Sequence, residues 1–368
     1  ILMQITNIEA IPIPIPFTQG GNSTNFIAGE GNELGHLLVK VETDSGITGY
    51  GEAFGFNAIH TTKTAIDTLV SPMAIGRDPL QIEALMKELS VKTHILGRYG
   101  VTMFALSGLD IALWDIAGKA AGIPLHQMLG GAQRHKIPAY ASLLKYGDPS
   151  VCARLTNEAL TQGYGLIKLH ENTVAPVAAA RAAAGEDIPI TLDVNCSWSP
   201  QEANEMAGKL ASCNLHWLEE PIWPPENFEA LYELRNLHGI PIAAGENACT
   251  AWQFSQMFKA GAVDYAQPSV TKVGGITEMT KVATLAEIEN VNLQPHSPYF
   301  GPGFLATLHV LAASSGTQSI ERFYVTLDAD MYEKALDPID GLIHIPDSPG
   351  LGLDPDPKFI EKYRLDNN

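Results

Sequence analysis

Apolar and polar positions alternate along the first part of the chain and then change to a helical spacing. Residues 5–16 alternate and contain three prolines, and residues 36–51 are predicted to form a hairpin with Asp44-Ser45-Gly46 as its turn. From residue 67 to about residue 122 the apolar positions follow the spacing of helices. Residues 1–130 are therefore predicted to form an α+β domain.

The segment from about residue 18 to residue 33 interrupts this pattern. It is rich in Gly, Asn, Ser and Thr and has no apolar periodicity. Loops of this length in compact domains often serve as lids. We therefore expect this segment to close over a binding site.

After Gly130-Gly131 short apolar runs alternate with Ala-rich helical stretches. Strands are expected near residues 138–144, 166–170, 189–195, 215–219, 241–246, 263–269, 291–296 and 318–324. Strands repeating every 25 residues or so, with helices between them, are typical of a parallel barrel. The prediction is an α/β fold with a TIM-type (β/α)7-8 barrel over residues 131–330. The tail, residues 331–368, contains no barrel unit and is expected to pack back on the first domain as part of a cap.

Composition and charge narrow the functional classes. The chain has 368 residues, 45% of them hydrophobic and 17% charged, with a mean hydropathy of +0.02, which indicates an ample core. A formal charge of −18 disfavours nucleic acid and anionic membrane surfaces as partners, and an anionic substrate would need local positive charge. Four scattered cysteines without a CxxC pair, and a start unlike a signal peptide, favour a cytoplasmic protein without a zinc–sulfur site.

Polar side chains gather at the predicted carboxyl ends of the barrel strands. Because alternate side chains share a face, Ile167 and Leu169 should face the helices, which leaves Lys168 and His170 facing the interior. The same parity points these polar residues inward on the following strands: Asp193, Asn195, Glu219, Glu246, Ser269, His296 and Glu321. Barrel enzymes build their sites at this end, and lone charges in a barrel core are costly. The pattern predicts an active site.

Three of these residues are candidate metal ligands. Asp193, Glu219 and Glu246 come from consecutive strands, so their carboxylates should lie side by side and repel one another unless they share a cation. A set of oxygen ligands favours a hard ion, Mg²⁺ first and Mn²⁺ or Ca²⁺ next. The alternative is that the same acids pair with lysines between the strands.

Lys168, His170 and His296 are candidate acid–base groups on the two sides of this cluster. The alternative for each histidine is a hydrogen-bonded core residue. Glu321 either stays protonated and donates a hydrogen bond to a substrate carboxylate, or pairs with a lysine. Residues that follow strand ends are candidates for substrate contact, although aromatic residues there are as often ordinary packing: Asn195, Ser269, Tyr299 and Trp198.

Several segments resemble one known family over nearly the whole chain. They are residues 105–119 and 124–131, Leu192-Asp193-Val194-Asn195, Trp217-Leu218-Glu219-Glu220-Pro221, Gly245-Glu246-Asn247 and Lys272-Val273-Gly274-Gly275. In order and spacing they are similar to the mandelate racemase and muconate lactonizing enzyme branch of the enolase superfamily. The resemblance implies one Mg²⁺ per subunit on Asp193, Glu219 and Glu246, a cap with a closing loop, a structural role for Lys272, and a homo-oligomer.

Departures from the family pattern bear on the reaction. The family's second barrel strand often carries Lys-x-Lys, whereas this chain has Lys168-Leu169-His170, so His170 takes the position of the base. On the sixth strand Ser269 stands where relatives carry a lysine or an aspartate that supports the opposite histidine. Loss of the lysine argues against cycloisomerisation and dipeptide epimerisation of the lysine-pair kind. Loss of the aspartate leaves His296 without its familiar partner.

Three functional hypotheses follow. Enolase-superfamily sites pair a Lys or His base with Mg²⁺, so the first is a dehydratase that removes the proton next to the carboxylate of a hydroxylated acid, such as an acid sugar. The second is a racemase or epimerase in which His170 and His296 act on opposite faces of one carbon. The third is a catalytically silent binding protein. The small-molecule carboxylate itself is not specified, because specificity lies in the loops.

Overall fold

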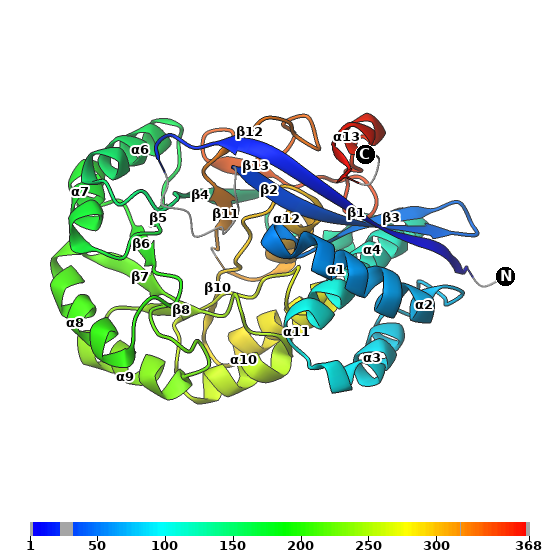
Figure 1. Ribbon diagram of the computed structural model, residues 1–368, viewed down its shortest axis with the longest axis horizontal. Coiled ribbons are helices and arrows are strands. Elements are labelled where there is room, and N and C mark those ends of the chain that lie inside the picture. Colours follow the sequence, from blue (N-terminus) through cyan, green and yellow to red (C-terminus); the bar gives the residue numbers. More distant parts are fainter. Residues whose placement is uncertain (1–2, 23–31, 317, 366–368) are drawn as a thin grey trace.

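The computed structural model describes residues 3–22, 32–316 and 318–365 (Figure 1). A small antiparallel sheet with its helices forms one end of the molecule, and a strongly curved parallel sheet with outer helices forms the other. This confirms the predicted α/β fold with a cap and a TIM-type barrel.

The cap sheet has the order β12-β1-β2-β3. Its strands are β1 (Ile5–Thr18), β2 (Glu33–Thr43), β3 (Thr48–Ala53) and β12 (Thr326–Leu327). Gly46, with φ +83°, lies in the turn of the predicted β2–β3 hairpin, where a left-handed conformation favours glycine. The helical region comprises η1 (Phe56–Ala58), α1 (Ile59–Ala65), η2 (Ile66–Val70), α2 (Ser71–Ala74), α3 (Ile82–Lys92), η3 (His94–Leu96) and α4 (Gly100–Ala121).

Helix α4 is the central helix of the cap. It approaches β3 so closely that a Cβ on Gly51 would lie 2.0 Å from the carbonyl oxygen of Gly108, which explains the glycine. By length and apolar composition alone α4 could cross a membrane, but 78% of its most apolar window is buried inside the protein. Such burial is typical of the core helix of a folded domain.

The barrel sheet has the order β10-β9-β8-β7-β6-β5-β4-β11, and every neighbouring pair is parallel. Its strands are β4 (Lys136–Ser142), β5 (Ile167–Leu169), β6 (Ile190–Asp193), β7 (Leu215–Glu219), β8 (Ile242–Ala244), β9 (Tyr265–Ala266), β10 (Asn292–Leu293) and β11 (Ile320–Phe323). Across the seam between β10 and β11, Gln294 Nε2 donates to the carbonyl oxygen of Ser319 at 2.6 Å. Each predicted barrel run therefore overlaps a strand.

Helices and short helical turns connect these strands and cover the outside of the sheet (Figure 1). They are α6 (Pro149–Thr161), α7 (Val174–Ala184), α8 (Pro200–Leu210), η4 (Ala211–Cys213), α9 (Phe228–His238), α10 (Thr250–Lys259), α11 (Gly275–Ile288) and α12 (Pro302–Ala313), while α5 (Leu125–Met128) leads from α4 to β4. Apolar side chains from the strands and these helices form one continuous core. This rigid frame holds the strand ends in place.

Several barrel strands are shorter than their apolar runs. β8 ends at Ala244, β9 at Ala266 and β10 at Leu293, so Glu246, Ser269 and His296 lie in the loops just beyond. Gly245, with φ +130°, turns the chain out of the ladder at the end of β8. These three polar residues therefore lie beyond the strands, where the backbone has left the sheet.

The carboxyl-terminal tail contacts both parts of the molecule. β13 (Leu342–His344) pairs antiparallel with barrel strand β4, and α13 (Pro357–Tyr363) follows it. On the cap side, Arg364 Nη2 lies 2.6 Å from Glu9 Oε1, and Leu351 N donates to Asp115 Oδ1 at 2.8 Å. Most of the predicted lid, residues 23–31, lies outside the described residues.

Candidate active site

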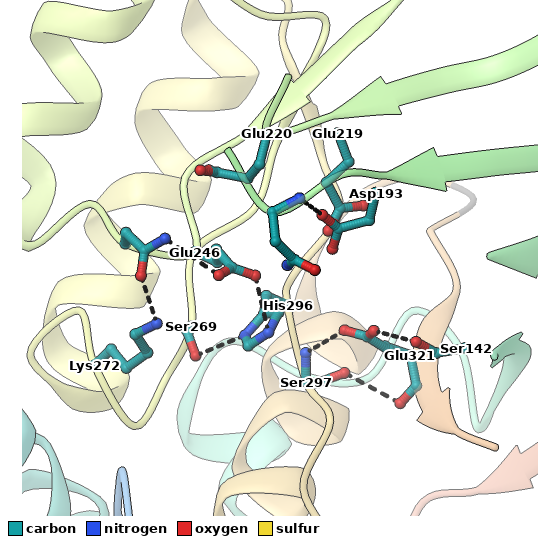
Figure 2. A network of polar contacts seen from close by, with 12 residues as sticks. Ser142, Asp193, Glu219, Glu220, Glu246, Ser269, Lys272, His296, Ser297 and Glu321 are labelled. Carbon is teal, nitrogen blue, oxygen red and sulfur yellow. Dashed lines mark hydrogen bonds and ion pairs between the residues drawn. The ribbon is translucent and has the colours of Figure 1, made fainter. Parts of the chain in front are cut away.

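Three carboxylates meet at the carboxyl ends of neighbouring strands. Asp193 ends β6 and Glu219 ends β7, and the two are paired in register, while Glu246 follows β8. One oxygen of each lies within 4.8 Å of the others (Figure 2). Asp193 and Glu219 are almost fully buried, at 1% and 0% exposure. The predicted metal-binding trio is thus brought together.

The donor set fits a hard divalent cation. All three residues offer carboxylate oxygens, which Mg²⁺ and Mn²⁺ prefer. Asp193 Oδ1 accepts a hydrogen bond from Asn195 N at 2.8 Å, but the buried Oδ2 has no hydrogen-bond partner among the described residues. Its contacts are ionic, with Lys168 Nζ at 3.1 Å and His170 Nε2 at 3.3 Å. A buried anionic oxygen in this situation is suited to a cation.

Lys168 lies in the middle of the acidic residues. Its fully buried Nζ contacts Asp193 Oδ2 and Glu321 Oε1, each at 3.1 Å, and also Glu219 Oε1. Burial alone lowers the pKa of Lys168, but Glu219, Glu321 and Asp193 outweigh it and raise the pKa well above its usual value. Lys168 is therefore a fixed ammonium, and the predicted pairing of these acids with a lysine occurs alongside the candidate metal site.

His170 lies on the Asp193 side of the cluster. Its Nδ1 contacts the carbonyl oxygen of Leu143, and its Nε2 lies 3.3 Å from Asp193 Oδ2. A carbonyl can only accept a hydrogen bond, so Nδ1 carries a proton. In the neutral ring the lone pair is then on Nε2, the nitrogen that faces the cluster. With Asp193 Oδ2 as its other neighbour, Nε2 can take up a proton only in this neutral form of the ring.

His296 lies at the other side of the cluster, next to Glu246. Its Nε2 is 3.1 Å from Glu246 Oε2, and its Nδ1 is 3.1 Å from Ser269 Oγ (Figure 2). Burial lowers the pKa of His296 to about 3. The ring is therefore neutral and held at both nitrogens. Ser269 is thus the partner of His296 Nδ1 that the sequence did not identify.

Glu321 supports the lysine rather than standing alone. Oε1 accepts from Ser142 Oγ at 2.7 Å, and Oε2 accepts from Ser297 N at 3.0 Å (Figure 2). Burial alone raises the pKa of Glu321, but the charge of Lys168 outweighs it and the pKa is lowered. Of the two predicted roles, the structure has the ion pair with a lysine.

The four predicted substrate-contact residues occupy different environments. Asn195 is exposed beside Asp193, and Ser269 and Tyr299 are buried and hydrogen-bonded to each other next to His296. Trp198 is 7% exposed and belongs to the hydrophobic core, with its carbonyl oxygen accepting from Trp223 N at 2.8 Å. Contact of these four with substrate stays a prediction.

Sequence parity missed a set of supporting residues. Glu220 is buried and accepts from Gly245 N at 3.0 Å and from Cys196 Sγ at 2.9 Å. Lys272 Nζ donates to Asn247 Oδ1 at 2.9 Å, and Asn247 Nδ2 donates to Glu246 Oε1 at 3.2 Å. The only signal for them was their place in the Glu219-Glu220-Pro221, Gly245-Glu246-Asn247 and Lys272-Val273-Gly274-Gly275 segments.

Comparison with known families supports the arrangement of two domains. Residues 30–130 match the family model described as "Mandelate racemase / muconate lactonizing enzyme, N-terminal domain". Residues 151–359 match the model described as "Enolase C-terminal domain-like". Together the two matches cover the cap from β2 to α5 and the barrel from α6 onward.

Named relatives act on acid sugars or their cyclic forms. The chain is 31% identical over 349 residues to the D-galactarolactone cycloisomerase of Agrobacterium fabrum, covering 90% of this chain and 91% of that protein. It is 30% identical over 339 residues to the arabinonate dehydratase of Saccharolobus solfataricus, covering 89% of this chain and 90% of that protein.

A solved structure resembles it over nearly its full length. A racemase from Streptomyces coelicolor with bound magnesium superposes with a TM-score of 0.86 at 27% identity, covering 98% of this chain and 100% of that chain.

Proposed function

Because the chain belongs to the mandelate racemase and muconate lactonizing enzyme branch of the enolase superfamily, we propose that it is a Mg²⁺-dependent acid sugar dehydratase. Its substrate would be a small hydroxylated carboxylate. The observation that carries the proposal is the cluster of Asp193, Glu219 and Glu246 oxygens within 4.8 Å, with a histidine on each side. The two named dehydratase and cycloisomerase relatives support the substrate class.

The chemistry requires an α-proton next to a carboxylate to be removed although it is very weakly acidic. Asp193, Glu219 and Glu246 would hold Mg²⁺, which when bound supplies positive charge for the negative charge that develops on the substrate carboxylate. Lys168, kept as an ammonium by its acidic neighbours, adds a second positive charge. Without these charges the enolate would be too unstable to form at a useful rate.

The residues of the chain would divide the proton transfers between them. His170 Nε2 takes the α-proton, because its Nδ1 is committed to the carbonyl of Leu143. The electron pair left on the α-carbon expels the β-hydroxyl, which leaves as water with a proton from a group on the other side of the cluster. Buried His296 is the nearest candidate for that group. The resulting enol becomes a 2-keto acid when the β-carbon takes the proton that His170 removed and the enol hydroxyl returns its proton to the group that protonated the leaving hydroxyl.

A second candidate reaction is cycloisomerisation of an acid sugar lactone or anhydro acid. It is favoured by the D-galactarolactone cycloisomerase relative and by a structural neighbour, the 3,6-anhydro-D-galactonate cycloisomerase of Zobellia galactanivorans. That neighbour has a TM-score of 0.84 at 28% identity and covers 98% of this chain and 99% of that chain. The first step would be the same, but the leaving oxygen would stay attached to the molecule. The missing lysine on the sixth strand disfavours only cycloisomerisation of the lysine-pair type.

Incubation with acid sugars and their lactones in D₂O, followed by NMR and mass spectrometry, tests the proposal. Dehydration predicts a keto acid that has lost one water, while cycloisomerisation predicts a product of unchanged composition with a ring opened or closed. A racemase or epimerase would place deuterium on the α-carbon of two stereoisomers. Absence of any Mg²⁺-dependent exchange across the panel would contradict the enzyme proposal and favour a binding protein.

The setting of the enzyme is also part of the proposal. We infer a cytoplasmic homo-oligomer that uses Mg²⁺, with Mn²⁺ as a substitute, and has no nucleic acid or membrane partner. The formal charge of −18 supports the absence of nucleic acid and membrane partners, and the four free cysteines support a reducing, cytoplasmic setting. Light scattering of the purified protein, at two concentrations, tests the oligomeric state.

A further inference from the structure

We propose that Tyr299 acts through Ser269 as a positioning residue for His296, and that this hydroxyl chain keeps the proton of the neutral imidazole on Nε2. His296 is then the acid of the reaction and His170 the base. The assignment of these two roles rests on the proposed function, but the orientation of His296 does not.

The contacts form one continuous chain. Ser269 Oγ lies 3.1 Å from His296 Nδ1 and is also hydrogen-bonded to the hydroxyl of Tyr299. Ser269, Tyr299 and His296 are 0%, 3% and 8% exposed, so water has little access to compete for these bonds. Figure 2 shows Ser269 and Glu246 meeting the two nitrogens of the His296 ring.

The direction of donation follows from the two ends of this chain. Glu246 Oε2, 3.1 Å from His296 Nε2, can only accept when ionised, which favours a proton on Nε2. Nδ1 of the neutral ring must then accept, and Ser269 can donate to it while accepting from Tyr299. Burial raises the pKa of Tyr299, so the phenol retains the proton that it donates. Every member of the chain is satisfied in this one direction.

A carboxylate in place of Ser269 would produce the opposite orientation. A carboxylate can only accept, so it would hold a proton on Nδ1 and leave the lone pair on Nε2, as the Leu143 carbonyl does for His170. The two histidines therefore have complementary partners. His170 presents an unprotonated Nε2 in its neutral form, and His296 presents an Nε2–H.

The cap holds Tyr299 in place. Tyr299 N donates to the carbonyl oxygen of Ser297 at 2.7 Å, and the ring of Phe56, from the cap, lies 6.4 Å from the Tyr299 ring. Glu52 on cap strand β3 accepts from Gly303 N at 2.8 Å, at the start of α12. The loop between His296 and α12 is thus anchored by the cap at its far end, which keeps the phenol against Ser269.

Nitrogen-15 NMR of the full-length protein with labelled histidines, with and without Mg²⁺, tests the orientation directly. The His296 signals are identified by their loss in His296→Asn. We expect the pattern of an Nε2–H imidazole in the wild type and in Ser269→Thr, and a shift toward the Nδ1–H pattern in Ser269→Asp. A wild-type Nδ1–H pattern, or signals unchanged in Tyr299→Phe, would overturn the proposal.

The second readout is the steady-state kinetics of an acid sugar that the enzyme dehydrates. Tyr299→Phe should lower kcat for water elimination roughly 10- to 100-fold with little change in KM, because an outer partner of a catalytic group is removed. Exchange of the α-proton in D₂O should persist, since His170 is untouched. Equal losses of exchange and elimination would contradict the division of roles.

A matched control separates positioning from a general effect of removing a buried phenol oxygen. Tyr332 is buried, and its hydroxyl has no hydrogen-bond partner within the described part of the chain. Tyr332→Phe should leave the His296 signals and both rates at wild-type values. If no acid sugar exchanges its proton with the wild type, the proposed function fails, whereas the NMR result still decides the orientation of His296.

Discussion

The two sides of the carboxylate cluster are equally buried but are held together in different ways. On one side, Lys168 contacts Asp193, Glu219 and Glu321, so charge is balanced by charge. On the other side, Nδ1 of His296 contacts the hydroxyl of Ser269, which is hydrogen-bonded to Tyr299, and only Nε2 faces a carboxylate, that of Glu246. Ion pairs keep groups ionised, whereas hydroxyl chains orient a neutral ring and set which nitrogen carries its proton. The side with Lys168 suits the charged carboxylate of a substrate, and the side with His296 suits a proton donor.

Asp193→Asn should have the largest effect, because it removes a candidate metal ligand and a partner of Lys168 at once. We expect Mg²⁺ affinity and α-proton exchange to fall by more than the roughly 100-fold that loss of an outer-shell group costs. Calorimetric Mg²⁺ titration and exchange in D₂O measure this. Asp67→Asn, at an exposed pair with Lys63, is the matched control and should change neither. If Asp193→Asn retained its Mg²⁺ affinity, Asp193 would not be a metal ligand and the metal site would lie elsewhere.

Lys168→Met tests the charged side through stability. Removing one partner of a buried ionic network leaves the remaining carboxylates uncompensated, which typically costs about 3–5 kcal/mol of the free energy of unfolding. Denaturant unfolding without Mg²⁺ should show this loss, and added Mg²⁺ should recover part of it by replacing the lost positive charge. Lys92→Met, at an exposed pair with Glu88, should change stability by less than about 0.5 kcal/mol. Similar losses in both variants would show that the network contributes little.

Asp110 shows how a buried carboxylate behaves when only neutral donors hold it. It accepts from Thr277 N at 3.0 Å and from Thr277 Oγ1 at 2.5 Å, with no basic side chain at ion-pair distance among the residues described. Burial raises its pKa from 3.8 to about 7. The folded protein therefore favours the protonated form, whose stabilising contribution is complete below pH 3.8 and is lost as the pH rises through about 7.

Asp110→Asn cannot ionise and should gain stability relative to the wild type as the pH rises from 4 to 8. The expected change is roughly 1–3 kcal/mol, the usual cost of a poorly compensated buried polar group. Thermal unfolding at pH 5 and pH 8 measures it. A stability difference between the two proteins that is independent of pH would contradict the raised pKa of Asp110.

Of the substitutions within the site, Ser269→Ala should have the smallest effect on stability. It removes neutral hydrogen bonds from the hydroxyl side, which are worth about 1 kcal/mol, and leaves every charge of the cluster in place. Denaturant unfolding of Ser269→Ala beside Lys168→Met compares the two sides directly. A loss as large as that of Lys168→Met would mean that both sides are held together with equal strength.

Local sequence pattern was sufficient for the barrel and for the inward polar residues. Each predicted run overlaps a strand, and Asp193, Glu219 and Glu246 meet as their parity indicated. Strand ends were less well predicted, because residues such as Ser269 and His296 lie in loops that leave the ladder. Trp198, a candidate pocket residue, belongs to the hydrophobic core, and its backbone forms an isolated bridge with Ile222.

By itself the sequence determined the cap and barrel architecture, the acidic trio and the two histidines, because alternation along a strand is a local property. Only the tertiary structure decided what each of these groups contacts. Lys168 could have been a free base, yet folding places it among three carboxylates. Tyr299 reaches Ser269 through a loop whose far end is anchored by Glu52 of the cap. Such pairings depend on the packing of segments far apart in the chain, and no local periodicity encodes these contacts.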